Sequence, residues 1–313
     1  IGSHSFEAPD EEAFWANIDV LSREIKVDLG LTNIQMNEDI DREIGMITSA
    51  SPRAYEQYIA GRKLPLNGKW MESIRLMEKA IAMDPGFAMA YRSLAMSYGD
   101  LRIHDKQRYC LQKAMDLKDR ISDKERYLIE GDYYRISGEK YFPQAILAYT
   151  RLLEIYPDDF DWYNNFALIY IDIEDWDKAQ DLLEKERAKD SRSPYYFHNR
   201  GVIELALGRY DAAQRLWQEY LRTVRDDSQV RRNLSFLYIY EQDYDRAIQE
   251  AEKAEALSLG DLGNALLRGD LNLYMGEFTK AQNEFGKLVL SEDPTYRLIG
   301  QIRLMMSAMV MGK

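Results

Sequence analysis

Cysteine and histidine are almost absent from this sequence. The single cysteine, Cys110, can form no disulfide within the chain and cannot supply a cysteine-rich zinc site. The three histidines, His4, His104 and His198, form neither an H-E-x-x-H motif nor a close pair. We therefore expect no metal and no cofactor, and we interpret Cys110 as a buried, unreactive thiol.

The sequence is also poor in proline and glycine. It has no long apolar run and no excess of positive charge. With 8 prolines and 18 glycines the sequence has too few turn formers for an all-β fold, while 46% hydrophobic residues can form a core. No apolar run reaches the roughly 18 residues that span a bilayer, and no signal peptide opens the chain. The 41 Lys and Arg against 53 Asp and Glu give a net charge of −12, which repels a phosphate backbone. These absences predict a soluble helical segment without membrane insertion or a nucleic-acid partner; its localisation is left open, with the cytoplasm favoured over an extracytoplasmic position.

Catalytic motifs are also lacking. The sequence contains no Ser-His-Asp arrangement, Gly-rich phosphate loop or nucleotide fingerprint. The acidic run 172–177 resembles a calcium loop, but it lacks the glycine and the twelfth-position glutamate, so we interpret it as a solvated turn. Asp158, Asp159 and Asp161 are expected to stabilise the start of a helix rather than to form an acid-base pair. We predict no enzymatic activity in this segment.

Three sets of residues recur along the chain at steps of 34 residues. Between them the hydrophobic residues are spaced as on one face of a helix, so each repeat predicts two helices. We expect a small residue on the first helix to face an alanine on the second, and large aromatics to fill the gaps between repeats. The small residues are Ala167, Gly201, Ser235 and Gly269, with the same step between Gly61 and Ala95 near the start. The alanines are Ala179, Ala213, Ala247 and Ala281. The aromatics are Trp176, Tyr210, Tyr244 and Phe278, with Trp70 at the same place in the first repeat.

A helix-turn-helix unit of 34 residues with this pattern resembles the tetratricopeptide repeat. About seven units fit residues 52–294, with first helices starting near residues 54, 88, 124, 160, 194, 228 and 262. The third unit has two additional residues in the turn after Gly138, and the second has Gln107 in place of the alanine. The resemblance implies an all-α, right-handed α-solenoid whose first helices line a groove for a protein or peptide.

Residues 6–50 do not fit the repeat and are strongly acidic, because eleven acidic and three basic residues give 3 − 11 = −8. Their apolar residues at 14, 18, 21, 25 and 29 predict an amphipathic helix. The junction at residues 51–62 is similar to that between a TolB-like domain and a repeat array in bacterial signalling proteins of the adenylate cyclase, Ser/Thr kinase or winged-helix type. We expect residues 1–5 to be a tag remnant, 6–50 an acidic helical leader belonging to a preceding domain, 51–294 the repeat array and 295–313 a C-terminal capping helix.

Asparagine recurs at the 34-residue step as Asn165, Asn199 and Asn233, each two residues before the small residue. An amide offers a donor and an acceptor, which matches the backbone of an extended peptide. The alternative is that these amides bond neighbouring helices. Other candidate groove residues in the same register are Tyr58, Arg62, Arg92, Met96, Leu168, His198, Val202, Arg232, Phe236, Leu266 and Tyr274.

We therefore predict a non-catalytic scaffold or sensor module of a bacterial signalling protein. Leu168, Val202 and Phe236 would supply apolar contacts to a partner segment, and Arg62, Arg92 and Arg232 would select its charge. The alternative is a self-association module that dimerises an absent catalytic or DNA-binding domain. The apolar segment 296–311 is expected to cover the last repeat with one face and to meet a partner or a second copy with the other, which makes a homo-oligomer an expected state.

Overall fold

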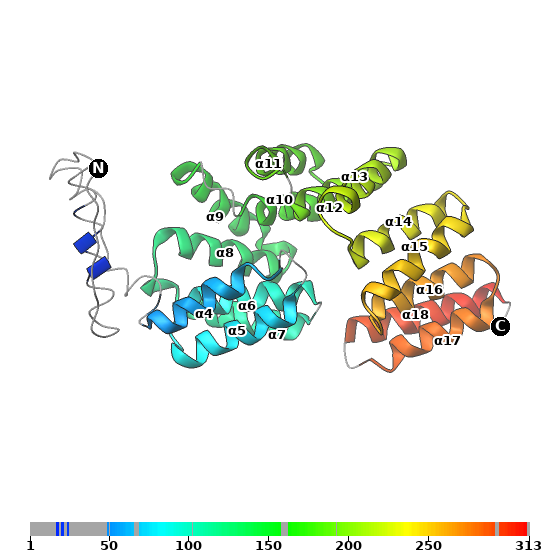
Figure 1. Ribbon diagram of the computed structural model, residues 1–313, viewed down its shortest axis with the longest axis horizontal. Helices are drawn as coiled ribbons and strands as arrows, with labels where there is room; N and C mark the ends of the chain where they lie inside the picture. Colours follow the sequence, from blue (N-terminus) through cyan, green and yellow to red (C-terminus); the bar gives the residue numbers. More distant parts are fainter. Residues whose placement is uncertain are drawn as a thin grey trace. The chain divides into compact units, whose positions relative to one another are not determined.

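The computed structural model describes residues 17–18, 20–21, 24, 49, 51–65, 69–101, 103–157, 162–191, 193–291 and 294–311. From residue 52 onward these residues form fifteen α-helices and two single-turn 3₁₀ helices, and no strand occurs among them (Figure 1). No helix in this described part of the chain has the length and apolarity needed to cross a membrane. Of the expected leader, five described residues are helical, Asn17, Ile18, Val20, Leu21 and Glu24, and the rest lies outside the described residues.

The chain divides into two compact units, residues 1–169 and 170–313. In the first unit consecutive helices pack as hairpins, α4 with α5, α6 with α7 and α8 with α9. Neighbouring hairpins are joined through α5 on α6 and α7 on α8. The elements are α4 (Pro52–Arg62), α5 (Trp70–Met83), α6 (Ala88–Asp100), α7 (His104–Asp116), η2 (Lys118–Arg120), α8 (Asp123–Ser137), η3 (Glu139–Tyr141), α9 (Phe142–Ile155) and α10 (Tyr163–Asp172), which extends past residue 169.

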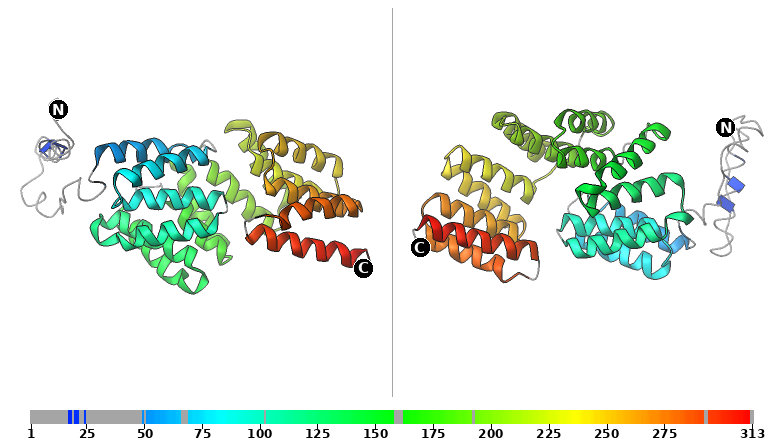
Figure 2. Two further views of the ribbon diagram at one scale, coloured as in Figure 1. Left: turned by 90° about the horizontal axis from the view of Figure 1, so that it is seen from below. Right: turned by 180° about the vertical axis from the view of Figure 1, so that it is seen from behind.

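The second unit repeats the same arrangement. Its hairpins are α12 with α13, α14 with α15 and α16 with α17, and the last helix, α18, lies along α17 (Figure 2, red beside orange). The first helices of the repeats begin within three residues of the expected positions, so the all-α, stacked-hairpin prediction is confirmed. The elements are α11 (Trp176–Lys189), α12 (Pro194–Ala206), α13 (Tyr210–Thr223), α14 (Ser228–Tyr240), α15 (Tyr244–Leu257), α16 (Leu262–Tyr274), α17 (Phe278–Val289) and α18 (Pro294–Val310).

The turn between the two helices has the same backbone conformation in the last four repeats. One residue of each of these turns is left-handed, at the same 34-residue step: Glu174 (φ 60°), Gly208 (72°), Gln242 (62°) and Gly276 (78°). Short polar side chains cap the N-termini of several helices; Ser122, for example, forms a capping box with Glu125 at the start of α8. In the third repeat the turn contains the three-residue 3₁₀ helix η3, and Gly131 faces Tyr149, eighteen residues later instead of sixteen, as the expected two-residue insertion requires.

The glycines among the small residues face a large side chain where an alanine was expected, whereas Ser235 contacts the alanine of its repeat, because its Oγ donates to the Ala247 carbonyl oxygen at 2.7 Å. A Cβ added to Gly201 would lie 2.2 Å from Trp217 Nε1, and one added to Gly269 would lie 2.3 Å from Phe285. The contact falls one turn beyond the alanine on the second helix, sixteen residues after the glycine. The glycines are therefore required because an aromatic ring occupies the place of their side chain.

The aromatic set also differs from the expectation. Each of its members is the first residue of a second helix, at the margin of the repeat, and Tyr210 is 44% exposed. The aromatic side chains that fill the interior stand elsewhere in the repeats. They are Phe87, Tyr149, Trp162, Phe197, Trp217, Tyr220 and Phe285.

Candidate functional site

Two of the residues expected in the groove of the first unit stand beside each other on α4. The ring of Tyr58 is 3% exposed and packs against Phe87 with ring centroids 4.8 Å apart, so it offers almost no surface to a partner. Arg62 is exposed, and its guanidinium lies 5.7 Å from the centre of the Tyr58 ring. Of this pair, Arg62 is the residue that a ligand could reach.

Two other groove residues of the first unit, Arg92 and Asn165, bond to an aspartate that was not among the predicted site residues. Asp132, on α8, is buried and accepts hydrogen bonds from three helices. Arg92 Nε on α6 donates to its Oδ2 at 2.7 Å, Asn165 Nδ2 on α10 donates to its Oδ1 at 3.0 Å, and Tyr149 Oη on α9 also donates to Oδ1. Four helices therefore meet at one carboxylate.

This cluster has the electrostatics of a structural ion pair. Burial alone would lower the pKa of Arg92, but the Asp132 carboxylate, Tyr149 and Tyr58 together outweigh burial, and the pKa is raised. Burial, and then the same carboxylate, raise the pKa of Tyr149 well above its usual value. With the Arg92 side chain only 13% exposed and paired, selection of a ligand's charge by this residue is not supported. Asp132 lies one residue after the small position, where Met96, Leu168, Val202 and Phe236 are apolar, and this difference was the signal in the sequence.

For Asn165 the geometry favours the bond between helices over the bond to a peptide. Asn165→Ala removes a hydrogen bond to a buried charged group, so we expect the free energy of unfolding to fall by about 1.5 to 3 kcal/mol. The matched variant Asn233→Ala should cost much less, because Asn233 Nδ2 is buried without a hydrogen-bond partner. Urea denaturation of both variants measures the difference, and equal losses would contradict this assignment.

In the second unit the expected residues lie on α12 and α14, the first helices of two repeats. His198 and Val202 are partly exposed and Asn199 is buried on α12. On α14, Asn233 and Phe236 are partly exposed. Together with Arg232 on α14 and with Leu266 and Tyr274 on α16, these residues are the part of the predicted site that belongs to the second compact unit, whereas Asn165 and Leu168 belong to the first unit.

Arg232, also on α14, is held by the next repeat. Its Nη1 lies 2.9 Å from Asn264 Oδ1 and 3.2 Å from Asp261 Oδ2, and its Nη2 donates to Gln229 at 2.7 Å. The side chain is 11% exposed. Like Arg92, it joins repeats, so the geometry does not support charge selection by Arg232.

A second buried carboxylate, Asp270 on α16, occupies the register position of Asp132. Arg303 Nε of α18 lies 2.9 Å from its Oδ1. Burial raises the pKa of Asp270 to about 6, and Arg303 opposes that rise. This ion pair connects α18 to the last repeat, and, as for Asp132, its signal in the sequence is a carboxylate at a position that is apolar in most other repeats.

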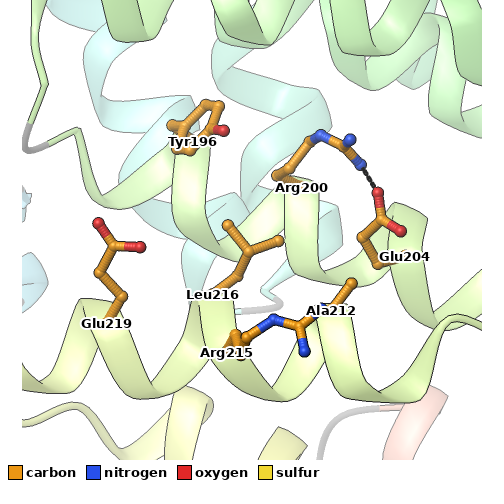
Figure 3. A pocket seen from close by; sticks show the side chains of 7 residues that line it. All are labelled: Tyr196, Arg200, Glu204, Ala212, Arg215, Leu216 and Glu219. Carbon is orange, nitrogen blue, oxygen red and sulfur yellow. Dashed lines mark hydrogen bonds and ion pairs between the residues drawn. The ribbon is translucent and has the colours of Figure 1, made fainter.

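A shallow pocket of about 300 Å³ opens between α12 and α13 (Figure 3). Two arginines and two glutamates line it, and Arg200 is paired with Glu204 within it. Because these charges balance, the pocket has no preference for an anion or a cation. Its lining residues are Tyr196, Arg200, Glu204, Ala212, Arg215, Leu216 and Glu219.

Glu186, on α11, is a buried carboxyl at the contact with α12. Ser193 Oγ donates to its Oε1 at 2.5 Å, and Oε2 is buried without a hydrogen-bond partner. Burial raises the pKa of Glu186 from 4.5 to about 7. No group of three or more metal-ligating side chains occurs within the described ranges, and burial raises the pKa of Cys110 to about 11, as expected for an unreactive thiol.

The raised pKa of Glu186 makes stability depend on pH. Its folded state binds the proton more tightly than the unfolded state, so the stabilisation is complete below about pH 4.5 and is lost as pH rises through about 7. The loss can reach roughly 3 kcal/mol. We expect Glu186→Gln to lack this loss. Urea denaturation of both proteins at pH 5 and pH 8 measures this loss, and the difference between the two proteins removes the contribution of the other titrating groups. An identical pH dependence in the variant would contradict the prediction.

The comparisons with known proteins agree with this architecture. Residues 198–261, which cover most of α12 and all of α14 and α15, match the family model of the tetratricopeptide repeat. No curated protein matches the chain.

Several solved structures share the fold. A tetratricopeptide repeat protein from Parabacteroides merdae ATCC 43184 is 15% identical, with 82% of this chain and 98% of that chain covered and a TM-score of 0.55. The human IFIT1 dimer with m7Gppp-AAAA is 13% identical, with 85% and 66% covered and a TM-score of 0.53. The APC/C hetero-tetramer Cut9-Hcn1 is 17% identical, with 85% and 49% covered and a TM-score of 0.50. With its helix hairpins and its 34-residue spacing, this chain has the fold of tetratricopeptide-repeat structures, and residues 198–261 match the family model of that repeat.

Proposed function

We propose that the chain is a non-catalytic scaffold that binds a segment of a partner protein, and that α12 and α14 carry the binding face in the second unit. Tetratricopeptide repeats are protein-binding modules, and the matched repeats include both helices. Val202 and Phe236, one residue after the small position on each helix, keep part of their apolar surface exposed. They would supply the hydrophobic contacts to the partner.

The buried side-chain amide of Asn233, whose donor has no partner, is the main observation behind this proposal. Its Oδ1 accepts a hydrogen bond from Gln229 Nε2 at 3.0 Å, while its Nδ2 has no partner. A buried amide donor without an acceptor is costly, and such groups in native proteins call for an explanation. A peptide carbonyl would satisfy it after a rotation of the side chain, because the residue as a whole remains partly exposed.

The test uses peptides selected from a random display library on the wild-type protein. We expect Asn233→Ala to weaken binding of the selected peptides by about two- to ten-fold, the loss of one hydrogen bond. Asn283, exposed on α17, provides the matched control, and Asn283→Ala should bind as the wild type does. Failure to select any peptide, or unchanged affinity in Asn233→Ala, would reject this face.

The setting that we propose is a bacterial signalling protein, with the acidic leader as the end of a preceding domain. Its support is the resemblance of residues 51–62 to the junction that follows a TolB-like domain. The natural gene sequence upstream of residue 6 is the test. A TolB-like domain there is the expected result, and an unrelated domain would reject the setting.

A further inference from the structure

The last helix, α18, leaves an apolar face uncovered. Its inner side is closely packed, because a Cβ on Gly300 would lie 2.8 Å from Leu288 Cβ and Ser307 is completely buried. The outer side carries six large apolar side chains that are 42 to 74% exposed, a concentration that marks an interaction surface. This stripe consists of Leu298, Ile302, Met305, Met306, Met309 and Val310.

The spacing of the stripe fits another helix. Leu298, Ile302, Met305 and Met309 follow one another at steps of four, three and four, the spacing by which two helices interdigitate along a common seam. Methionine side chains adapt to an irregular partner surface. We therefore expect an amphipathic helix to pack against this stripe.

The charge of the α18 segment indicates what kind of helix would bind the stripe. Residues 294–313 contain Arg297, Arg303 and Lys313 and no acidic residue. Arg303 is paired with Asp270, and the segment as a whole retains a positive balance. A complementary helix should therefore carry acidic residues beside its apolar stripe, whereas a second α18 would bring like charges together.

The leader of this chain has the complementary pattern. Phe14, Ile18, Leu21 and Ile25 follow at the same steps of four, three and four, which predicts a helix with a matching stripe. Residues 14–29 contain two basic and three acidic residues, so their net charge is 2 − 3 = −1, and Asp10, Glu11 and Glu12 directly before them add three negative charges. Both the apolar spacing and the sign of the charge match the uncovered face of α18.

We propose that the stripe on α18 binds the leader helix, residues 14–29, of a second copy of this chain. Such an interface joins two different surfaces, so the copies associate head to tail. It does not depend on the peptide-binding face on α12 and α14. The proposed interface joins the acidic leader of one copy to the apolar end of the repeat array of another.

Sedimentation velocity of the full chain over a wide concentration range tests the proposal. The wild type should show a mass that rises with concentration. Leu21→Asp in the leader and Met305→Asp on α18 should each weaken self-association by at least about ten-fold, because a charge is placed in an apolar seam. Met71→Asp is the matched control, since Met71 is an exposed methionine on α5, and it should associate as the wild type does. Equal thermal midpoints show that the variants remain folded.

A mixture separates this interface from its alternatives. Equimolar Leu21→Asp and Met305→Asp should form a heterodimer, because the first retains an intact stripe and the second an intact leader. Strong self-association of Leu21→Asp alone would indicate pairing of two α18 helices and would overturn the proposal. A wild type that is monomeric at every concentration would overturn it as well, since the stripe would then be covered by its own leader, by another protein or by nothing.

Discussion

Gly201→Leu should lower the free energy of unfolding by roughly 1 to 3 kcal/mol, as overpacking of a core usually does. The expected loss follows from Trp217, whose indole is completely buried and would lie 2.2 Å from a Cβ at this position. A rigid ring within the core cannot move away without displacing its neighbours. Leucine has the better helix propensity by about 1 kcal/mol, and this gain is too small to offset the clash.

The matched control is Gly286→Ala in the middle of α17. An added Cβ there meets no atom within 4 Å, so the variant should gain about 0.5 to 1 kcal/mol from the reduced backbone entropy of its unfolded chain. Thermal and urea denaturation of the wild type and both variants gives the comparison. A Gly201→Leu protein as stable as the wild type would contradict the register between α12 and α13.

Removal of the buried carboxylate in Asp132→Ala should lower the free energy of unfolding by about 3 to 5 kcal/mol. The variant leaves the Arg92 guanidinium largely buried without a counter-charge, and it also removes the acceptor of Tyr149 and Asn165. The loss should therefore exceed that of Asn165→Ala, which removes one donor only. Urea denaturation of the variants provides the measurement.

Two further variants show whether the unpaired charge of Arg92 causes the loss of stability in Asp132→Ala. Asp270→Ala removes the equivalent carboxylate, but its partner Arg303 is 34% exposed and can be hydrated, so the loss should be clearly smaller. The double variant Arg92→Met with Asp132→Leu replaces the ion pair by apolar side chains and should recover much of the stability. If the double variant were less stable than Asp132→Ala, the unpaired arginine would not be the cause.

The stacked helix hairpins of this protein can be predicted from its sequence alone. Each repeat solves the same packing problem, so the small residues, the alanines and the helix starts return every 34 residues and can be counted directly. For this reason the expected starts at residues 88, 194, 228 and 262 coincide with those of α6, α12, α14 and α16. The capping box at Ser122 was equally visible, because it depends on residues three positions apart.

Side-chain partners across helices were decided only by the tertiary structure. The register identified Gly201 as a position of close approach, but whether Ala213 or Trp217 fills it depends on how α12 and α13 lie against each other. Likewise, Asn165 was visible as a candidate for peptide binding, whereas its bond to Asp132 requires α8 and α10 to be adjacent. A repeat fixes which face of a helix is buried, while the partner of each polar group on that face depends on the position and orientation of a helix some 30 to 40 residues away in the chain.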